Sequence, residues 1–134
     1  MSLLDITSSQ VQGDISVTIL HLKGQLDRNT DDQLLGRALQ SHEDGARYLL
    51  LDLSELEMLT SSGLHTIHTL FRMFTPQADL DKMHQHLGEM YKSPYFKIAC
   101  PNPQVYYVLN ITGFVQNIFV FNNMDEAVRS FGGQ

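Results

Sequence analysis

The order of apolar and polar residues near the start of the chain predicts two strands. Across residues 15–23 apolar and polar side chains alternate for much of the run, and Gly24 ends it. That pattern is typical of a strand with one solvated face. Residues 3–11 alternate more loosely and would pair with the first run through a turn at residues 12–14. The chain is therefore expected to begin with a β-hairpin.

A helix and a buried strand are predicted next. Thr30 and Gln33 have the spacing of a capping box, in which each side chain bonds to the other residue's backbone N–H group. Apolar residues follow at helical intervals, which predicts a helix over residues 30–42. Residues 48–53 form a continuous apolar run too short for a helix and typical of a strand covered on both faces. We expect this run to be the central strand, with residues 54–59 as a connection.

Two amphipathic patterns follow this connection, separated by Pro76. The first carries apolar residues on one helical face until the proline interrupts it: Leu64, Ile67, Leu70, Phe71 and Phe74. The second predicts another amphipathic helix that ends near residues 93–94, with an apolar stripe of Leu80, Met83, Leu87, Met90 and Tyr91.

The last third of the chain alternates short strands with short helices. Residues 95–100 and 118–121 are expected to be strands. Asn102 and Pro103 supply an N-cap and a first helical residue, and Asn123 supplies the cap of a terminal helix. Strands that alternate with helices predict an α/β layer architecture rather than a bundle or a sandwich.

Composition restricts the classes of function. The 134 residues predict a single domain over residues 1–134. Fifteen acidic against nine scattered basic residues argue against a nucleic-acid binder, which needs clustered Lys and Arg. One cysteine, Cys100, excludes an internal disulfide. We find no apolar run of membrane-spanning length and no signal peptide, so we expect a soluble cytoplasmic protein that does not bind membranes.

The segment with the most candidate chemistry lies at the start of the helix before Pro76. Thr60, Ser61 and Ser62 place three hydroxyls, followed by Gly63, where unpaired N–H groups and the helix dipole favour an anion. A simpler interpretation is that Thr60 or Ser61 is the N-cap and that the other hydroxyls are solvated.

The order of several segments resembles the STAS domain family, which is found in anti-sigma factor antagonists and in the cytoplasmic tails of sulfate transporters. The resemblance rests on LLDLSELEMLTSSGL at residues 50–64, GQLD at 24–27, LNITGF at 109–114, and Glu126 with Ala127. It covers nearly the whole chain. It implies a mixed β-sheet of about five strands with helices packed on it, plus an extra amphipathic helix in an insert at residues 75–94.

In antagonists of this family a serine at the position of Ser61 is phosphorylated by a cognate anti-sigma kinase. The unmodified protein binds that kinase and releases the sigma factor. The resemblance thus implies a regulatory module whose partner is an anti-sigma factor or a serine kinase of the histidine-kinase-like ATPase type. Asp27 matches an aspartate on the partner-facing surface, and Thr60, Ser62, Gly63 and His65 complete the candidate partner-binding residues.

Two departures from the family pattern leave alternatives open. Thr60 stands where the family usually has Asp, so a kinase could choose Thr60 or Ser62 instead of Ser61. A STAS domain without the phosphoswitch would act as a scaffold or small-ligand sensor in a larger signalling assembly. The second departure is the insert of about 20 residues at 75–94. We expect its apolar stripe to be buried against a second copy of the chain or a partner, rather than in the chain's own core.

Other chemistry is predicted to be absent. His65 and His68 are neighbours on one helix, and His84 and His86 lie in the insert, but no third metal ligand is fixed by the spacing. A hydrolytic triad of Ser61, His65 and Asp52 would lack the Gly-x-Ser-x-Gly elbow. We therefore expect a non-enzymatic module with no catalytic residue, cofactor or metal.

Overall fold

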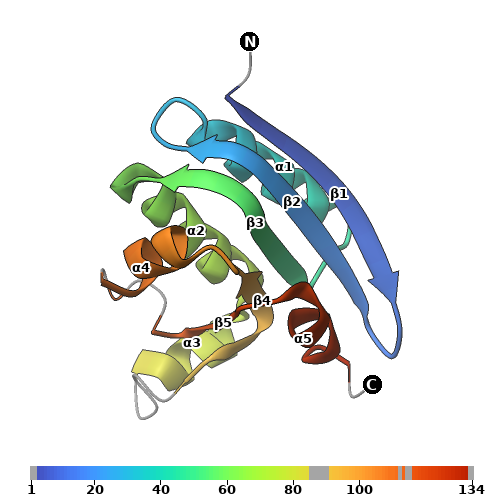
Figure 1. The fold of residues 1–134 in the computed structure, drawn as a ribbon. Coiled ribbons are helices and arrows are strands. Elements are labelled where there is room, and N and C mark those ends of the chain that lie inside the picture. Colours follow the sequence, from blue (N-terminus) through green and yellow to red (C-terminus); the bar gives the residue numbers. More distant parts are fainter. Residues whose placement is uncertain (1–2, 85–90, 112, 114–115, 133–134) are drawn as a thin grey trace.

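The structure is a computed structural model, and it describes residues 3–84, 91–111, 113 and 116–132. In this part of the chain a single sheet has five strands in the spatial order β1-β2-β3-β4-β5. β1 runs antiparallel to β2, and the later strands run parallel to one another (Figure 1). The strands are β1 (Leu4–Gln12), β2 (Ser16–Leu26), β3 (Leu49–Leu59), β4 (Ser93–Ala99) and β5 (Ile118–Phe121).

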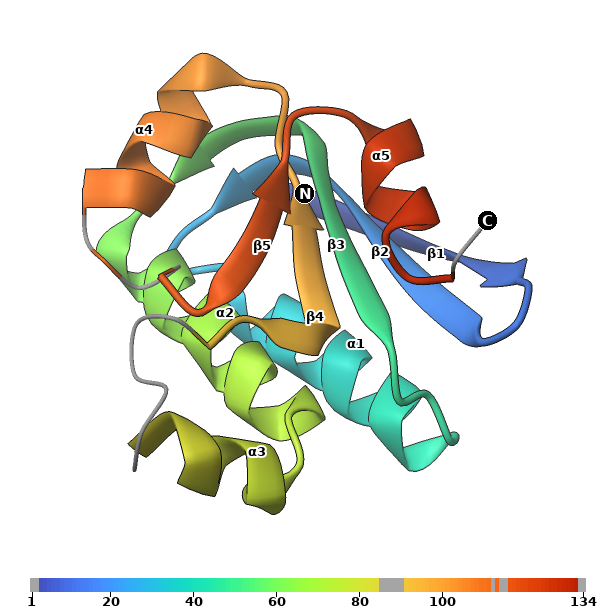
Figure 2. The ribbon, with the colours of Figure 1, turned by 90° about the horizontal axis from the view of Figure 1, so that it is seen from below.

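Helices cover both faces of the sheet. Figure 2 shows α5 on the opposite side of the sheet from α1, α2 and α3, and the buried residues of α4 belong to the same core as those of α1 and α2. This mixed sheet between helices confirms the predicted α/β fold. Across the described residues no helix has the length and apolar character needed to span a membrane. The helices are α1 (Asp31–Glu43), α2 (Ser61–Phe74), α3 (Gln77–Lys82), α4 (Pro103–Ile111) and α5 (Met124–Arg129).

The central strand is β3, as the apolar run predicts. Leu49, Leu51 and Leu53 are buried in the larger core beneath α1 and α2. Leu50 faces the other way into a smaller core that includes Ala127 of α5. Because helices lie on both sides of β3, apolar residues are favoured at successive positions of this strand.

The prediction that β2 has one solvated face is wrong for its first half. Val17 and Ile19 are buried in the smaller core with α5, while Leu20 and Leu22 are buried in the larger core. Thr18 is also buried, although its polarity suggested a solvated face. β2 lies inside the sheet between β1 and β3, so helices reach both of its faces.

β3 is also longer than predicted, because residues 54–59 continue the strand instead of forming a connection. Two irregularities interrupt its pairing with β2. Between the pairs His21–Asp52 and Lys23–Glu55, and again between Gly24–Leu56 and Gln25–Met58, β3 carries one extra residue. Such bulges break the alternation on which strand prediction depends. The buried positions therefore fall at intervals of three: Leu53, Leu56 and Leu59.

The start of α1 differs from the predicted capping box. The Thr30 hydroxyl makes no capping bond to the helix. It accepts from the Asp27 N–H at 3.0 Å and donates to the Gln25 carbonyl at 2.8 Å. The Gln33 side chain reaches the Leu4 carbonyl at 3.5 Å. Thr30 thus closes the loop between β2 and α1. The loop brings the Asp27 N–H and the Gln25 carbonyl within reach of the Thr30 hydroxyl, which bonds to them instead of to the helical N–H groups.

The insert begins with α3, and Leu87 and Met90 lie outside the described residues. Leu80 and Tyr91 are buried in the chain's own larger core, and Met83 packs against it. The Tyr91 hydroxyl donates to Asp79 Oδ2 at 2.7 Å. The pKa of Tyr91 is raised, mainly by burial and secondly by this hydrogen bond. For these members of the stripe the expectation of burial against a second copy or a partner is wrong, since the domain itself covers them.

The start of α2 packs closely on the end of β2 at Gly63. A Cβ at this position would lie 2.7 Å from the Leu26 carbonyl oxygen and 2.9 Å from side-chain atoms of Leu26 and Leu59. Gly36, in the middle of α1, has no atom within 4 Å of an added Cβ. The two helical glycines therefore differ in what surrounds them.

We expect Gly63→Ala to destabilise the fold, because overpacking costs about 1–3 kcal/mol and exceeds the ~1 kcal/mol gain in helix propensity. Gly36→Ala should instead stabilise it by up to about 1 kcal/mol. Urea denaturation of both variants measures the difference. Equal stabilisation by both substitutions would contradict the close packing of α2 on β2.

Candidate functional site

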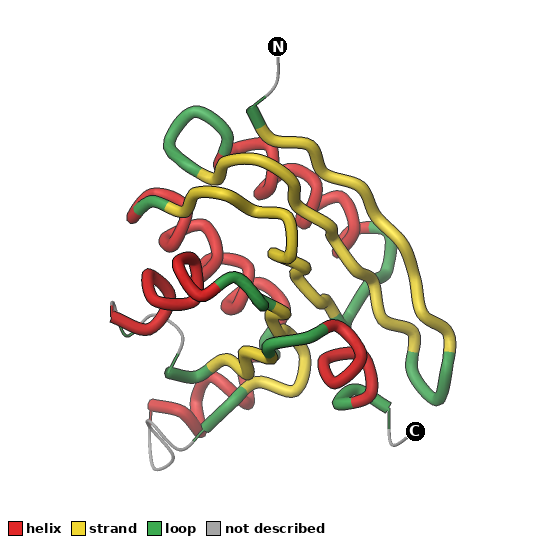
Figure 3. The backbone as a smooth tube through the Cα atoms, in the orientation of Figure 1, coloured by secondary structure: helices red, strands yellow, loops and turns green. Residues whose placement is uncertain are grey.

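The predicted site residues gather where two parallel strands end. β2 and β3 remain paired up to Leu26 and Leu59, so the loop that leads into α1 and the start of α2 lie at one edge of the sheet (Figures 1 and 3). An open groove of about 710 Å³ lies there. It is lined by Asp27, Arg28, Asn29, Asp31, Met58, Thr60, Ser61, Ser62, His65, Thr66 and Thr69.

Five of the six predicted residues line this groove, namely Asp27, Thr60, Ser61, Ser62 and His65. Gly63 does not line it. It is buried against Leu26 and Leu59, and this close approach excludes a side chain. Gly63 thus positions the start of α2 and offers no side-chain surface to a partner.

Thr60 is the N-cap of α2, as the simpler interpretation of this segment proposed. Its backbone is extended, and its hydroxyl accepts from the Gly63 N–H at 3.4 Å. The same hydroxyl donates to the Leu26 carbonyl at 3.5 Å, and the Thr60 N–H donates to that carbonyl at 3.1 Å. Thr60 therefore attaches the helix to the end of β2.

Ser62 is bonded to a residue that the sequence analysis did not select. Its hydroxyl donates to Asp31 Oδ2 at 2.5 Å, which joins the first turn of α2 to the first turn of α1. An acidic residue in a first helical turn is common because it complements the helix dipole, so Asp31 carried no distinguishing signal. Only the packing of α1 beside α2 shows that its carboxylate belongs to the groove.

Ser61 differs from its two neighbours. It is the first residue of α2, its side chain is exposed, and it lines the groove. Within the described part of the chain its hydroxyl makes no hydrogen bond to another residue. Of the three adjacent hydroxyls, that of Ser61 alone is held by neither a cap nor a carboxylate.

Asp27 has a structural as well as a surface role. Its Oδ1 accepts from the Asn29 N–H at 2.8 Å and contacts the Thr30 hydroxyl at 3.4 Å. This arrangement is an Asx turn, in which the side chain mimics a backbone turn. The half-buried carboxylate also faces the groove, so the turn and binding interpretations of Asp27 are compatible.

The charges around the groove are mixed. Asp27 and Asp31 contribute carboxylates, and Arg28 contributes a guanidinium. No acidic residue occupies the first turn of α2, so the positive end of its dipole faces the groove without a carboxylate from its own helix. A negative group on Ser61 would meet favourable helix N–H groups but would also increase the negative charge beside the two aspartates.

The histidines show no metal centre in the described residues, where no group of three His, Cys, Asp or Glu could hold an ion. His65 lines the groove, whereas the ring of His68 lies 5.7 Å from that of Phe71. Burial, with Arg72 and His65 nearby, lowers the pKa of His68. His86 lies outside the described residues.

The triad of Ser61, His65 and Asp52 is not formed. Asp52 lies seven residues before the end of β3, which at about 3.3 Å per residue is roughly 20 Å along the strand. Its carboxylate is bonded to His21 and Ser54 instead.

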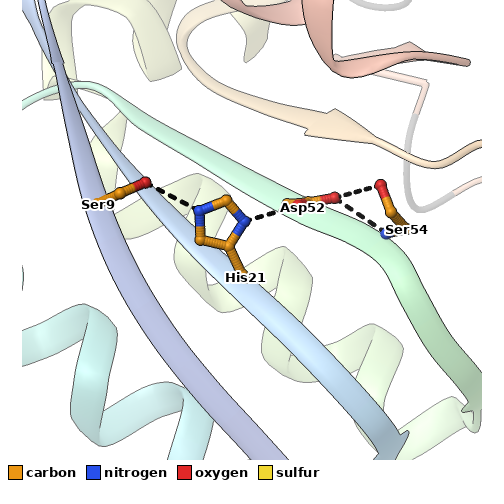
Figure 4. Close-up of polar contacts among 4 residues, drawn as sticks. All are labelled: Ser9, His21, Asp52 and Ser54. Atoms are coloured by element: carbon orange, nitrogen blue, oxygen red, sulfur yellow. Dashed lines mark hydrogen bonds and ion pairs between the residues drawn. The ribbon is translucent and has the colours of Figure 1, made fainter.

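A second polar cluster that the sequence analysis missed surrounds Asp52 (Figure 4). His21 lies between Ser9 and Asp52, and Ser54 bonds to the other carboxylate oxygen. Burial acts to raise the pKa of Asp52, but the hydrogen bonds from Ser54 and His21 outweigh it and hold this pKa below its usual value. No sequence motif marks the cluster, because its members come from three strands and meet only through the sheet register.

Comparison with known proteins agrees with this fold. The family model described as the STAS domain matches residues 8–78, which is more than half of the chain. A search of curated protein sequences finds no match. Similarity to solved structures is extensive, although the sequence identities are low.

Three of these structures are of antagonists. An anti-sigma factor antagonist from Mycobacterium paratuberculosis is 19% identical, with 95% of this chain and 94% of that chain covered and a TM-score of 0.71. The unphosphorylated anti-sigma factor antagonist SpoIIAA is 16% identical, with 93% and 94% covered and a TM-score of 0.65. The phosphorylated form of the Bacillus cell fate determinant SpoIIAA is 15% identical, with 92% and 96% covered and a TM-score of 0.58.

At such identities the structural likeness shows the fold alone. The family match rests on the sequence, and the resemblance noted at residues 50–64 and 24–27 lies within the matched region. The five-stranded sheet and the groove at the carboxyl ends of β2 and β3 are consistent with it. The chain therefore belongs to the STAS domain family.

Proposed function

We propose that this STAS domain is a protein-binding regulator of the anti-sigma factor antagonist type, switched by phosphorylation of Ser61. Its partner is an anti-sigma factor or a serine kinase of the histidine-kinase-like ATPase type, and it acts in the cytoplasm as a non-enzymatic module. The observation that supports this proposal best is the exposed Ser61 hydroxyl, which no other described residue engages, beside a groove lined by Asp27 and His65.

The choice of Ser61 follows from what holds its neighbours. The Thr60 hydroxyl caps α2, and the Ser62 hydroxyl donates to Asp31. A hydrogen bond to a charged group contributes about 1.5–3 kcal/mol, which phosphorylation of Ser62 would forfeit. Ser61 requires no such loss, and its position at the edge of the groove allows a kinase to approach it.

The physics of the switch is electrostatic. A phosphoserine adds about −1.5 to −2 charges near pH 7. The start of α2 accommodates this charge within the domain, because helix N–H groups and the dipole favour an anion. A partner that docks over the groove would bury the phosphate beside Asp27 and Asp31, which is unfavourable. The same modification is thus neutral for folding and unfavourable for binding.

The similar structures support the partner class. Two of them are named as anti-sigma factor antagonists, and SpoIIAA is described in both a phosphorylated and an unphosphorylated form. These names apply to those proteins, and transfer to this chain is part of the proposal.

A second candidate is a STAS scaffold or small-ligand sensor without the switch. Thr60 favours it, because this residue stands where the family usually has an acidic side chain. Affinity capture from the native host separates the two candidates. A histidine-kinase-like ATPase supports the antagonist, whereas a multi-protein sensor complex supports the scaffold.

The cognate kinase with ATP should add one phosphate, at Ser61, and phosphopeptide mapping will locate it. Ser61→Ala should remove the modification. Ser61→Asp should melt at a similar temperature but bind the kinase at least tenfold more weakly, which isothermal titration measures. A phosphate on Thr60 alone, or unchanged affinity of Ser61→Asp, would reject the proposed switch.

Asp31 is expected to restrict phosphorylation to Ser61. In Asp31→Ala the Ser62 hydroxyl loses its acceptor, so the kinase should modify both serines. The matched control is Asp32→Ala, which removes the same charge from the same helical turn. Mapping of phosphopeptides should show Ser62 modified in the first variant only. Exclusive modification of Ser61 in both would show that Asp31 does not select the site.

Two substitutions of Asp27 should distinguish its role in the turn from its role in partner binding. In Asp27→Asn the amide oxygen can still accept from the Asn29 N–H, so stability should change by less than about 0.5 kcal/mol while partner affinity falls. Asp27→Ala should lose about 1 kcal/mol because the turn bond is lost. Chemical denaturation and titration measure the two effects. Wild-type affinity in Asp27→Asn would leave Asp27 a turn residue only.

A further inference from the structure

A line of hydrogen bonds crosses the first three strands of the sheet (Figure 4). The Ser9 hydroxyl lies 2.8 Å from His21 Nε2, and His21 Nδ1 lies 2.7 Å from Asp52 Oδ2. His21 shares a face of β2 with Val17 and Ile19, which lie in the smaller core with α5. The line therefore lies on the face opposite α1 and α2.

The direction of each hydrogen bond follows from the groups involved. Asp52 is held as a carboxylate, since the pKa of this group is lowered, and a carboxylate only accepts hydrogen bonds. His21 Nδ1 must therefore carry the proton that it shares with Asp52. In the neutral imidazole Nε2 is then an acceptor, and the Ser9 hydroxyl donates to it.

The line also runs from the interior to the solvent. The Asp52 side chain is 13% exposed, that of His21 is 35% exposed, and Ser9 is exposed. The other oxygen of Asp52 accepts from the Ser54 N–H at 3.0 Å and from the Ser54 hydroxyl, so the carboxylate is fixed from both sides. A fixed carboxylate, an oriented imidazole and an accessible hydroxyl are the parts of an activated nucleophile.

We propose that Ser9 is a nucleophilic serine that accepts an acyl group from an activated acyl ester. His21 acts as its general base, and Asp52 is a positioning residue that sets the imidazole tautomer. This site is separate from the groove at Ser61 and goes beyond the function proposed above. It needs no kinase, cofactor or metal.

The transfer step balances within these groups. Ser9 Oγ forms a bond to the acyl carbon while its proton passes to His21 Nε2. The bond between the acyl carbon and the alcohol oxygen of the donor then breaks, and the departing oxygen takes the proton from Nε2. The products are O-acyl-Ser9, neutral His21 and the free alcohol or phenol.

The sheet register supplies a donor for the acyl oxygen. The Gln25 N–H donates to the Leu3 carbonyl and the Gly13 N–H to the Ile15 carbonyl, so odd-numbered residues of β1 face β2. The Gln10 N–H therefore points to the other side of β1, where the described residues add no further strand. The N–H group of the residue after a nucleophile is a common oxyanion donor. Because the Gln10 N–H is a single donor at the free edge of β1, it stabilises the oxyanion only weakly. We therefore expect only esters with a good leaving group to react.

The test uses the whole chain with p-nitrophenyl acetate, followed by intact mass measurement and peptide mapping. We expect acetylation of Ser9 in the wild type, none at this peptide in Ser9→Ala, and about a hundredfold slower acetylation in His21→Gln, since general-base catalysis contributes at least that factor. Ser8→Ala is the matched control. Ser8 is also exposed, but its side chain lies on the opposite face of the sheet from that of Ser9, so this variant should react like the wild type.

The role of Asp52 is tested by Asp52→Asn and by the imidazole ¹⁵N spectrum. Recorded at a pH at which the ring is neutral, the wild-type spectrum should show the His21 proton on Nδ1. In the variant an amide N–H can donate to Nδ1, which moves the proton to Nε2 and should slow acetylation of Ser9 at least tenfold. Acetylation confined to lysines, equal labelling of Ser8 and Ser9, or full reactivity in His21→Gln would overturn the proposal and leave a purely structural hydrogen-bond network.

Discussion

The parallel pairing of β2 with β3 fixes the position of both polar sites in this domain. It continues to the last pair, Leu26 with Leu59, so the chain leaves both strands at the same place. The Leu26 carbonyl then accepts from the Thr60 N–H at 3.1 Å, and Gly63 approaches the same carbonyl so closely that no Cβ fits. The Ser61 hydroxyl is thereby held on the end of a rigid sheet instead of on a loose loop, which gives a partner a fixed surface.

The same pairing also creates the polar cluster on the face of the sheet opposite α1 and α2. His21 lies opposite Asp52 in the last pair before the first bulge of β3. A shift of one residue in the register would turn one of these side chains to the opposite face of the sheet. The two bulges come after this pair, so they alter the course of β3 toward Leu59 without separating His21 from Asp52. β3 thus contributes to the groove at the carboxyl end of the sheet and to the polar cluster on one of its faces.

The sequence predicts what depends on local chemistry. The hairpin turn, the apolar face of α2 and the N-caps at Asn102 and Asn123 follow from neighbouring residues, and the structure confirms them. The candidate groove could also be anticipated, because the carboxyl ends of parallel strands share an edge. What failed depends on other elements. Thr30 resembled a capping residue, but the β2–α1 loop provides closer partners.

The side-chain contacts at both polar sites could not be predicted from the sequence either, because they join residues that are far apart along the chain. Asp31 and Ser62 are 31 positions apart and meet only because α1 packs beside α2. His21 and Asp52 are also 31 positions apart, and the pattern of apolar residues does not predict that they lie opposite each other in the sheet. In the insert, an apolar stripe shows that burial is required but does not say against what. Leu80 and Tyr91 are buried in the larger core of the same chain, because the two ends of the insert are joined to α2 and β4.

The two exposed serines illustrate how environment sets the chemistry of one functional group. Ser61 has the positive end of a helix beside it, and no described residue hydrogen-bonds to its hydroxyl, so in the proposed switch the kinase would have to supply the base. Ser9 has an oriented imidazole at 2.8 Å but no helix end to favour an anion. The first environment suits a group that must carry a phosphate stably. The second suits a group that reacts by itself. Because the two serines use different hydrogen-bond partners, either site can be altered while the other is retained, provided that the pairing of β2 with β3 is preserved.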